Sequence, residues 1–146
     1  MEQTCILVKP DGVCRNSVGA VLARFSQVGL RPRALKMLRL SPAQAEGFYQ
    51  EHKGKPYYEP LIRFMTSAPI VASVWEGPDA IAKAREVMGA TNSPEAAPGT
   101  IRREFGTSNR YNVVHGSDSA ASAQREIEFF FKPEELHEYN KGDWEM

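Results

Sequence analysis

A single histidine stands directly before a stretch that is typical of a helix start. His115 follows the β-branched pair Val113-Val114, and it precedes Gly116 and three possible capping residues, Ser117, Asp118 and Ser119. The free N–H groups and positive dipole at a helix N-terminus favour a phosphate. Because the unperturbed pKa of histidine is about 6.5, the neutral, nucleophilic ring dominates at neutral pH. The stretch indicates phosphate chemistry, although a histidine before a helix is more often structural.

Cationic side chains at two places could hold such a phosphate. Lys9 ends the apolar run 4–8, which predicts a buried strand, so its ammonium group lies at a strand end. Arg85 falls on the apolar side of a predicted helix, with Ala84 and Met88. A cation on the buried side needs an anionic partner. That partner is either a carboxylate of the chain or a phosphate, which suits the guanidinium fork.

Carboxylate and aromatic side chains supply further candidates. Glu126 and Glu128 could each orient His115, and the sequence does not choose between them. Tyr49 and His52 are three positions apart and share one face of a predicted helix. Packing in the core or at an interface is the usual role of such aromatic residues.

Hydrophobic periodicity and helix-capping residues predict the elements that would position these groups. Strands are predicted over 4–8, 33–40 and 70–75, with a further one leading into His115. Helices are predicted over 18–28, 42–52, 58–65, 80–88 and 120–131. Ser17, Ser41 and Asp79 are expected to cap the first, second and fourth of these helices, and Ser41 with Gln44 matches a capping box.

The segments between these elements predict turns and loops. Pro10-Asp11-Gly12 predicts a turn, and 89–99 predicts a long loop of the kind that is often functional. The strand over 33–40 alternates apolar and basic residues, so its basic side chains are expected to form a solvated face. The segment 132–146 is a charged tail with Trp144, which suggests docking onto a neighbouring subunit.

The order of these elements is βαββαβ. It predicts a ferredoxin-like α+β sandwich with a four-stranded antiparallel sheet and its helices on one face. The length of 146 residues predicts one domain, 1–146.

Composition excludes several classes of protein. Lys+Arg and Asp+Glu are 18 each, so no net charge draws the chain to nucleic acid or to a membrane surface. No apolar run approaches the roughly 18 residues of a membrane span, and no signal peptide is recognised. Cys5 and Cys14 fit reduced thiols, and the three histidines lack metal-site spacing. The sequence therefore predicts a cytoplasmic protein without a structural metal.

The chain resembles the nucleoside diphosphate kinase family. Its stretch 112–119 is similar to the signature that holds a transiently phosphorylated histidine. Five further motifs match in order and spacing: Lys9-Pro10-Asp11-Gly12-Val13, Val74-Trp75-Glu76-Gly77, Gly89-Ala90-Thr91-Asn92, Pro98-Gly99-Thr100-Ile101-Arg102 and Phe131-Lys132-Pro133-Glu134-Glu135-Leu136. The chain departs from the family at Ser93, because relatives commonly have proline directly after the asparagine.

The resemblance implies a role for each candidate residue. His115 would be the nucleophile, with Glu126, Tyr49 and Ser117 completing the catalytic group. Arg85, Thr91 and Arg102 would hold phosphate oxygens, and His52 would reach a phosphate. Lys9 would contact the ribose and the phosphates, and Asn112 would contact the ribose. Tyr57 would stack on the base, with Leu61 beside it. Stacking of this kind accepts any base.

The resemblance also implies an activity. The γ-phosphate of a nucleoside triphosphate would pass to a nucleoside diphosphate by a ping-pong mechanism through phosphorylated His115. Mg²⁺ would arrive with the nucleotide, because no carboxylate cluster indicates a dedicated metal site. The family forms homo-oligomers, and the long tail favours a hexamer over a tetramer. The alternative is a ferredoxin-like module that senses nucleotides without turnover, and it would not require His115 together with Glu126.

Overall fold

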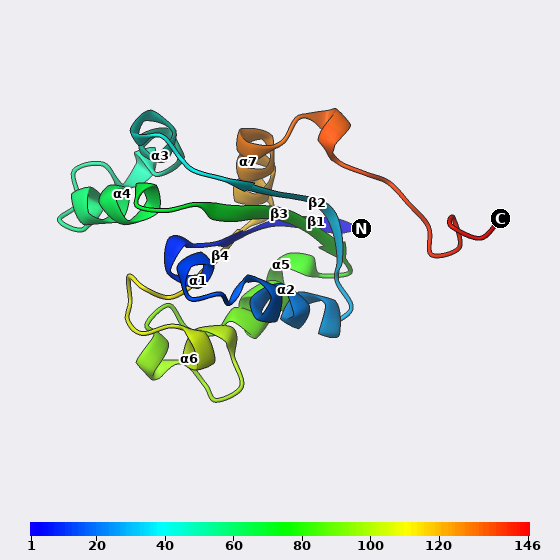
Figure 1. Ribbon diagram of the computed structural model, residues 1–146, viewed down its shortest axis with the longest axis horizontal. Helices are drawn as coiled ribbons and strands as arrows, with labels where there is room; N and C mark the ends of the chain where they lie inside the picture. Colours follow the sequence, from blue (N-terminus) through cyan, green and yellow to red (C-terminus); the bar gives the residue numbers. More distant parts are fainter.

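A four-stranded antiparallel sheet in the order β2-β3-β1-β4 divides the molecule (Figure 1). The computed structural model describes residues 1–146. The strands are β1 (Glu2–Val8), β2 (Arg31–Leu38), β3 (Ile70–Gly77) and β4 (Val114–Gly116). β3 is buried along its whole length between β1 and β2, whereas β2 and β4 are edge strands. The predicted ferredoxin-like fold with its four-stranded sheet is confirmed.

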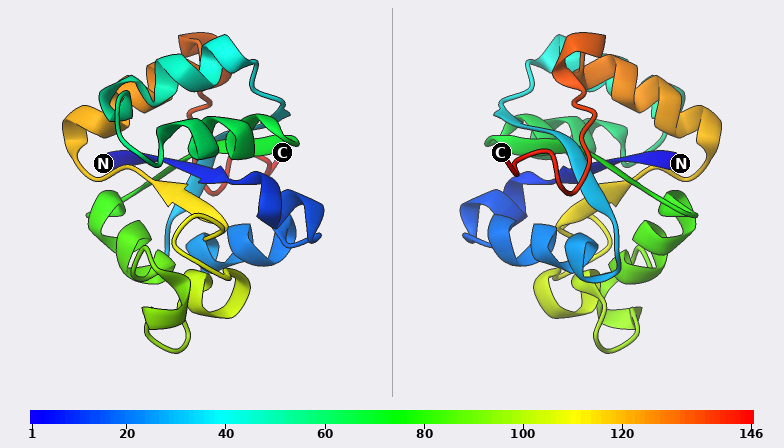
Figure 2. Two further views of the ribbon diagram at one scale, coloured as in Figure 1. Left: turned by 90° about the vertical axis from the view of Figure 1, so that its left-hand side faces the viewer. Right: turned by 90° about the vertical axis from the view of Figure 1, so that its right-hand side faces the viewer.

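Helices cover both faces of this sheet. One layer holds α3 (Pro42–Phe48), α4 (Tyr58–Thr66) and α7 (Ala120–Phe130). The other holds α1 (Pro10–Cys14), α2 (Val18–Gln27), α5 (Ala80–Met88) and α6 (Ile101–Phe105). Both end-on views show the same two layers (Figure 2).

The prediction that the helices lie on one face is therefore wrong. Side chains alternate along β1, so that Cys5 and Leu7 join one hydrophobic core and Ile6 and Val8 join the other. A central strand that is apolar on both faces requires cover on both.

Several local predictions were correct. The Ser41 hydroxyl accepts the Gln44 backbone N–H at 3.1 Å, and the Gln44 side chain accepts the Ser41 N–H at 2.9 Å, which forms the expected capping box. The predicted helix over 42–52 is shorter than expected, because α3 ends at Phe48 and the chain continues as a 3-10 turn, Gln50–His52. Of the three possible caps before α7, the Ser119 side chain is the one that accepts an N–H of the first turn.

Other local predictions were wrong. A short helix, α1, begins at Pro10 where a turn was predicted, and α6 was not predicted at all. Neither Ser17 nor Asp79 makes a side-chain capping bond. Asp79 has a left-handed backbone, with φ at 51°, and the Glu2 carboxylate accepts the Ile81 N–H at the start of α5 instead.

The edge strand β2 reverses the expected pattern of burial. Arg33 is buried, and its guanidinium donates to Glu76 at 2.6 Å, whereas Leu35 and Met37 are 57% and 61% exposed. The basic residues therefore do not all form a solvated face, because the carboxylate of Glu76 on β3 pairs with Arg33. Two apolar side chains are left facing outward on β2.

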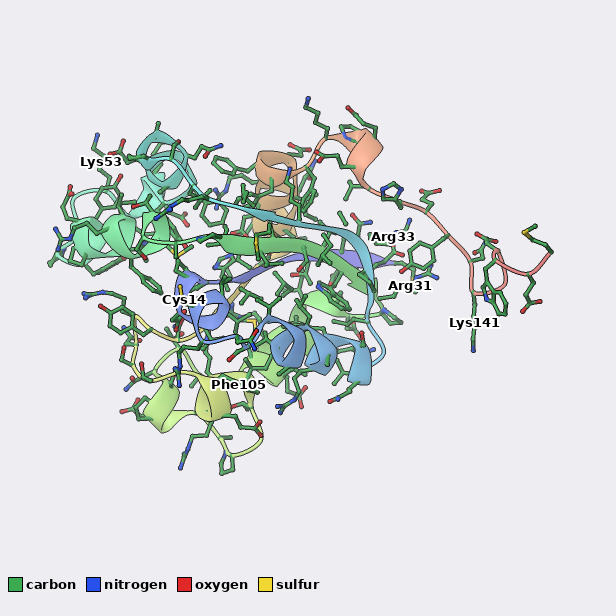
Figure 3. The ribbon with its side chains drawn as sticks, in the orientation of Figure 1. Cys14, Arg31, Arg33, Lys53, Phe105 and Lys141 are labelled. Atoms are coloured by element: carbon green, nitrogen blue, oxygen red, sulfur yellow. The ribbon has the colours of Figure 1, made fainter.

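The tail first follows β2 and then leaves the body of the molecule (Figure 1). The His137 N–H donates to the Arg33 carbonyl at 2.9 Å, and the Arg31 guanidinium lies 5.0 Å from the centre of the Tyr139 ring. Arg31 and Arg33 lie beside the departing tail in Figure 3. Trp144 is 78% exposed. None of the helices in the chain combines the length and apolar character needed to cross a membrane.

Candidate active site

A cleft of about 670 Å³ contains nearly all the predicted site residues. The cleft is lined by α4, which covers one face of the sheet, and by α5 and the segment around α6, which cover the other face (Figure 1). The predicted residues along it are Lys9, His52, Tyr57, Leu61, Arg85, Thr91, Arg102, Asn112, His115 and Glu126. Tyr49 and Ser117 do not line the cleft.

His115 and Glu126 form the centre of the site. His115 lies in β4 opposite Leu7 of β1, and its side chain is 23% exposed. Its Nε2 lies 2.9 Å from Glu126 Oε1. An ionised carboxylate only accepts hydrogen bonds, so Nε2 carries the proton and Nδ1 keeps its lone pair. The arrangement leaves one ring nitrogen available as a nucleophile.

Ser117 holds the carboxylate in this position. Its hydroxyl donates to the same Oε1 of Glu126 at 2.8 Å and accepts the Cys5 N–H at 3.1 Å. Glu126 is buried, whereas Glu128 is exposed and accepts from Gln124 on its own helix. The structure therefore places Glu126, and not Glu128, at His115, a choice that the sequence left open.

An aromatic wall supports the histidine ring. The Phe48 ring packs edge-on against His115, with ring centres 5.6 Å apart. The buried Tyr49 ring packs edge-on against Phe48, with ring centres 4.9 Å apart, and burial raises the pKa of its hydroxyl well above the usual value. That hydroxyl has no hydrogen-bond partner within the chain. Phe48 was not among the predicted site residues, because its position on an apolar helix face is also that of an ordinary core residue.

The cleft is lined by four cations that have no carboxylate partner, Lys9, Arg85, Arg102 and Arg110. Arg102 is buried and donates to the carbonyls of Gly89 at 3.1 Å and Val114 at 2.8 Å. Arg85 donates only to a carbonyl, that of Gly116 at 3.3 Å. Lys9 is buried and takes no part in an ion pair. Positive charge without a counter-ion in a cleft favours an anionic ligand.

The burial of these cations changes their titration. Desolvation and the nearby Arg102 guanidinium lower the pKa of Lys9 to about 8. Desolvation and Arg85 lower the pKa of Arg102 to about 10. Arg85 itself is exposed at the margin of α5, whose buried face is Ala80, Ala84 and Met88. The prediction that Arg85 lies on the buried side is therefore wrong, although its side chain does reach the cleft.

Asn112 links three parts of the cleft. Its amide oxygen accepts from Lys9 Nζ at 2.9 Å, and its amide nitrogen donates to the carbonyls of Thr91 and Asn109, each at 3.0 Å. Elsewhere in the cleft, the Tyr57 hydroxyl lies 2.7 Å from His52 Nδ1, and Tyr57 is 43% exposed. The cleft therefore combines an exposed aromatic face with cationic side chains.

Eight residues of the cleft were not among the predicted site residues: Glu51, Ser108, Asn109, Arg110, Tyr111, Gly116, Asp118 and Ser122. Tyr111 packs edge-on against Phe64 of α4, with ring centres 5.0 Å apart. A hydrogen bond from Ser122 lowers the pKa of Asp118. Asp118 was recognised only as a possible cap, and Arg110 and Tyr111 lie in a loop without a periodic pattern. No group of three or more His, Cys, Asp or Glu side chains is placed to hold a metal ion.

Comparisons with known proteins identify the family to which the chain is similar. The family model described as nucleoside diphosphate kinase matches residues 2–136. A nucleoside diphosphate kinase of Carboxydothermus hydrogenoformans is 55% identical over 141 residues, covering 97% of this chain and 95% of the relative. One from Moorella thermoacetica is 55% identical over 136 residues, covering 93% and 98%.

Solved structures are similar over the same length. The Aquifex aeolicus nucleoside diphosphate kinase has a TM-score of 0.90 at 45% identity, covering 93% of this chain and 99% of that one. A halophilic nucleoside diphosphate kinase from Halobacterium salinarum, solved in complex with CDP, has a TM-score of 0.93 at 41% identity, covering 96% and 93%.

Proposed function

The chain belongs to the nucleoside diphosphate kinase family, and from this premise we propose how its residues carry out the reaction. It is a nucleotide-binding enzyme that transfers the γ-phosphate of a nucleoside triphosphate to a nucleoside diphosphate. The non-catalytic nucleotide-sensing module considered as an alternative is therefore set aside. The observation that carries the assignment of residues is the contact between His115 and Glu126 in a cleft whose cations lack carboxylate partners.

In the proposed first half-reaction, Nδ1 of His115 attacks the γ-phosphorus. The N–P bond forms while the P–O bond to the β-phosphate breaks, and the nucleoside diphosphate leaves with that electron pair. The proton stays on Nε2, where Glu126 accepts it in a hydrogen bond of 2.9 Å. In the second half-reaction a β-phosphate oxygen of another diphosphate attacks the phosphohistidine, and the N–P bond breaks. A single covalent carrier makes the mechanism ping-pong.

The remaining residues align the substrate and stabilise its charge. We assign Arg85, Arg102 and Thr91 to phosphate oxygens, because the two arginines have donors free of carboxylates. Lys9 and Asn112, joined at 2.9 Å, are assigned to the ribose hydroxyls.

The aromatic residues are assigned to the base and to the histidine. Tyr57 would stack on the base with Leu61 beside it, and His52 would reach a phosphate. Tyr49, whose buried hydroxyl has no partner, and Ser117 would position the catalytic group from behind.

We propose that Mg²⁺ enters with the nucleotide as part of the substrate. It would neutralise charge on the β- and γ-phosphates when bound there. The proposal is supported by the donors that line the cleft: its carboxylates, Glu51, Asp118 and Glu126, are too few and too dispersed to form an all-protein site.

We further propose that the enzyme assembles as a homo-oligomer, a hexamer rather than a tetramer. Support comes from Leu35 and Met37, which are exposed on the edge strand β2, and from the tail, which carries an exposed Trp144. Edge strands with apolar side chains are ready pairing surfaces. We treat 1–146 as one kinase domain whose segment 132–146 serves subunit contact. A cytoplasmic location fits the two free cysteines, Cys5 and Cys14.

Intact mass spectrometry tests the proposed covalent step. After incubation with Mg-ATP, the wild type should gain one acid-labile phosphate, and a GDP chase should remove it. His115→Ala should gain none, while His137→Ala, which changes an exposed histidine outside the cleft, should behave as wild type. Phosphate on the His115→Ala variant, or none on the wild type, would refute His115 as the carrier.

Native mass spectrometry tests the assembly. The wild type should give six copies of the chain, and Leu35→Lys with Met37→Lys should give smaller species. Val28→Lys is the matched control, because Val28 is an exposed aliphatic residue outside β2. A mass of four copies would contradict the hexamer. An unchanged assembly in the double variant would exclude β2 as a contact.

A further inference from the structure

A strained turn lies immediately before His115. Val113 has a φ of 74°, although its side chain is β-branched and fully buried. The Val114 N–H donates to the Asn112 carbonyl at 2.8 Å, which closes a turn of three residues centred on Val113. Such turns with positive φ are rare and strained, and β-branched residues are the least suited to them. A turn of this kind persists only where the surrounding structure holds it.

The segment after β1, the strand next to β4, holds this turn. The Asp11 carboxylate accepts the Val113 N–H at 3.1 Å, and the Lys9 N–H donates to the Val113 carbonyl at 2.7 Å. Both backbone groups of the strained residue are thus satisfied from positions that are about a hundred residues away in the sequence.

The shape of the same segment is fitted to the Val113 side chain. A Cβ atom at Gly12 would lie 3.1 Å from Val113 Cγ1 and 2.7 Å from Val8 Cγ1. A side chain at position 12 would therefore collide with Val8 and crowd Val113, so this close approach requires a glycine.

The turn sets the relation between two site residues. Asn112, on one side, contacts Lys9 and the Thr91 carbonyl, and His115 follows on the other side in β4. The Val114 carbonyl between them accepts from Arg102 at 2.8 Å. A relaxed backbone at Val113 would change the spacing and direction of the Asn112 and His115 side chains. It would also move the Val114 carbonyl that Arg102 contacts. Displacements of about 1 Å can cost about a hundredfold in rate.

Asp11 does not line the cleft, so it has no direct contact with a nucleotide bound there. We propose that Asp11 is a positioning residue of the phosphoryl transfer, and that its carboxylate holds Val113 in the left-handed turn that sets His115 relative to Asn112. The inference rests on the proposed function, because it takes His115 as the nucleophile.

The first test compares the side chains that can occupy position 11. Asp11→Ala removes the acceptor, and the rate of phosphohistidine formation should fall by about tenfold to a hundredfold. Asp11→Asn keeps an amide oxygen that can accept the Val113 N–H, so it should restore most of the rate. Asp79→Ala is the matched control, because Asp79 also stands at a helix start, but its side chain makes no capping bond.

The decisive test repeats Asp11→Ala in a Val113→Gly background. Glycine adopts positive φ without steric cost, so the turn no longer depends on Asp11. Asp11→Ala should then reduce the rate by less than about threefold, relative to Val113→Gly alone. A role of Asp11 confined to helix α1 would give the same loss in both backgrounds, and that result would overturn the proposal.

Two further readings separate this inference from general effects. The thermal midpoint of each variant is measured, and the rates of phosphohistidine formation are taken well below that midpoint. A variant that lowers the midpoint without lowering the rate affects stability alone, and that result counts against positioning. If the wild type forms no phosphohistidine, the proposed function itself fails. If the wild type forms it and Asp11→Ala forms it equally fast, only the role of Asp11 fails.

Discussion

Glu126 Oε1 lies 2.9 Å from His115 Nε2, which leaves Nδ1 as the ring nitrogen for the proposed attack on phosphorus. The same oxygen accepts the Ser117 hydroxyl at 2.8 Å. The carboxylate therefore selects one tautomer of the imidazole and fixes the direction of its free lone pair.

Glu126→Gln should slow the formation of phosphohistidine by about tenfold to a hundredfold, the range of one charge-assisted hydrogen bond. The affinity for nucleotide should change little, because the contact is made to His115 and not to a cation of the cleft. Single-turnover phosphorylation followed by mass spectrometry measures the rate. Glu128→Gln changes the exposed carboxylate two residues away and serves as the control. Equal losses in both variants would contradict the role assigned to Glu126.

Arg102→Ala should weaken triphosphate transfer by about 1–3 kcal/mol, the contribution of a contact to a charged group. Arg102 also joins Gly89 to Val114, so Arg102→Lys is needed to separate loss of charge from loss of the guanidinium fork. Steady-state kcat/KM for ATP reports the change. Arg63→Ala, an exposed arginine on α4 outside the cleft, is the control. Unchanged kinetics in Arg102→Ala would remove this residue from the site.

Tyr57→Ala should weaken the binding of adenine, guanine and pyrimidine nucleotides by similar amounts, about 1–3 kcal/mol for the lost base stacking. Tyr57→Phe keeps the stacking face and loses only the hydroxyl, which contacts His52 at 2.7 Å. Titration calorimetry with ADP, GDP and CDP measures the three affinities. A loss confined to one base would refute simple stacking.

Nucleotide binding should depend on the protonation of Lys9, whose pKa is lowered to about 8. The ammonium group is charged below pH 8, so affinity should be highest there and fall as the pH rises through 8. Lys9→Arg should remove this dependence, because a guanidinium stays charged over the range. Affinities measured between pH 6.5 and 9.5 test it. A flat profile in the wild type would contradict the role of the lysine charge.

The same lysine affects the stability of the unliganded protein in the opposite sense. A free lysine has a pKa of about 10.4, so between pH 8 and that value the unfolded state binds more protons than the folded state. The contribution of Lys9 to the free energy of unfolding should therefore rise with pH across this window. Denaturant unfolding of the wild type and Lys9→Met at pH 7 and pH 9.5 measures the difference. A smaller gain for the wild type than for the variant would contradict this sign.

Arg110→Ala should raise KM for nucleotides by about fivefold, because the half-buried guanidinium lines the cleft and makes no ion pair. The effect should shrink as salt is added, since screening weakens interactions between exposed charges. KM at low and high ionic strength measures both effects. A loss in kcat at unchanged KM would indicate a different role.

Much of the fold followed from patterns contained within short segments. The capping box of Ser41 and Gln44, the buried strand β3 and the apolar side of α7 each depend on neighbours a few positions away. Such i, i+3 and i, i+2 relations are complete in the local sequence, so they determine local structure directly. The motif around His115 likewise placed the histidine before a helix.

The tertiary structure decided what depends on distant partners. It brought Glu126 rather than Glu128 to His115, and it buried Arg33 against Glu76. At the start of α5, the carboxylate that accepts a backbone N–H is that of Glu2 and not that of Asp79. It also forced Val113 into the left-handed region. Each of these outcomes depends on which strands are neighbours and which faces are covered. The order of the strands and the two helix layers are properties of the whole packed chain, and a short window of sequence does not contain them.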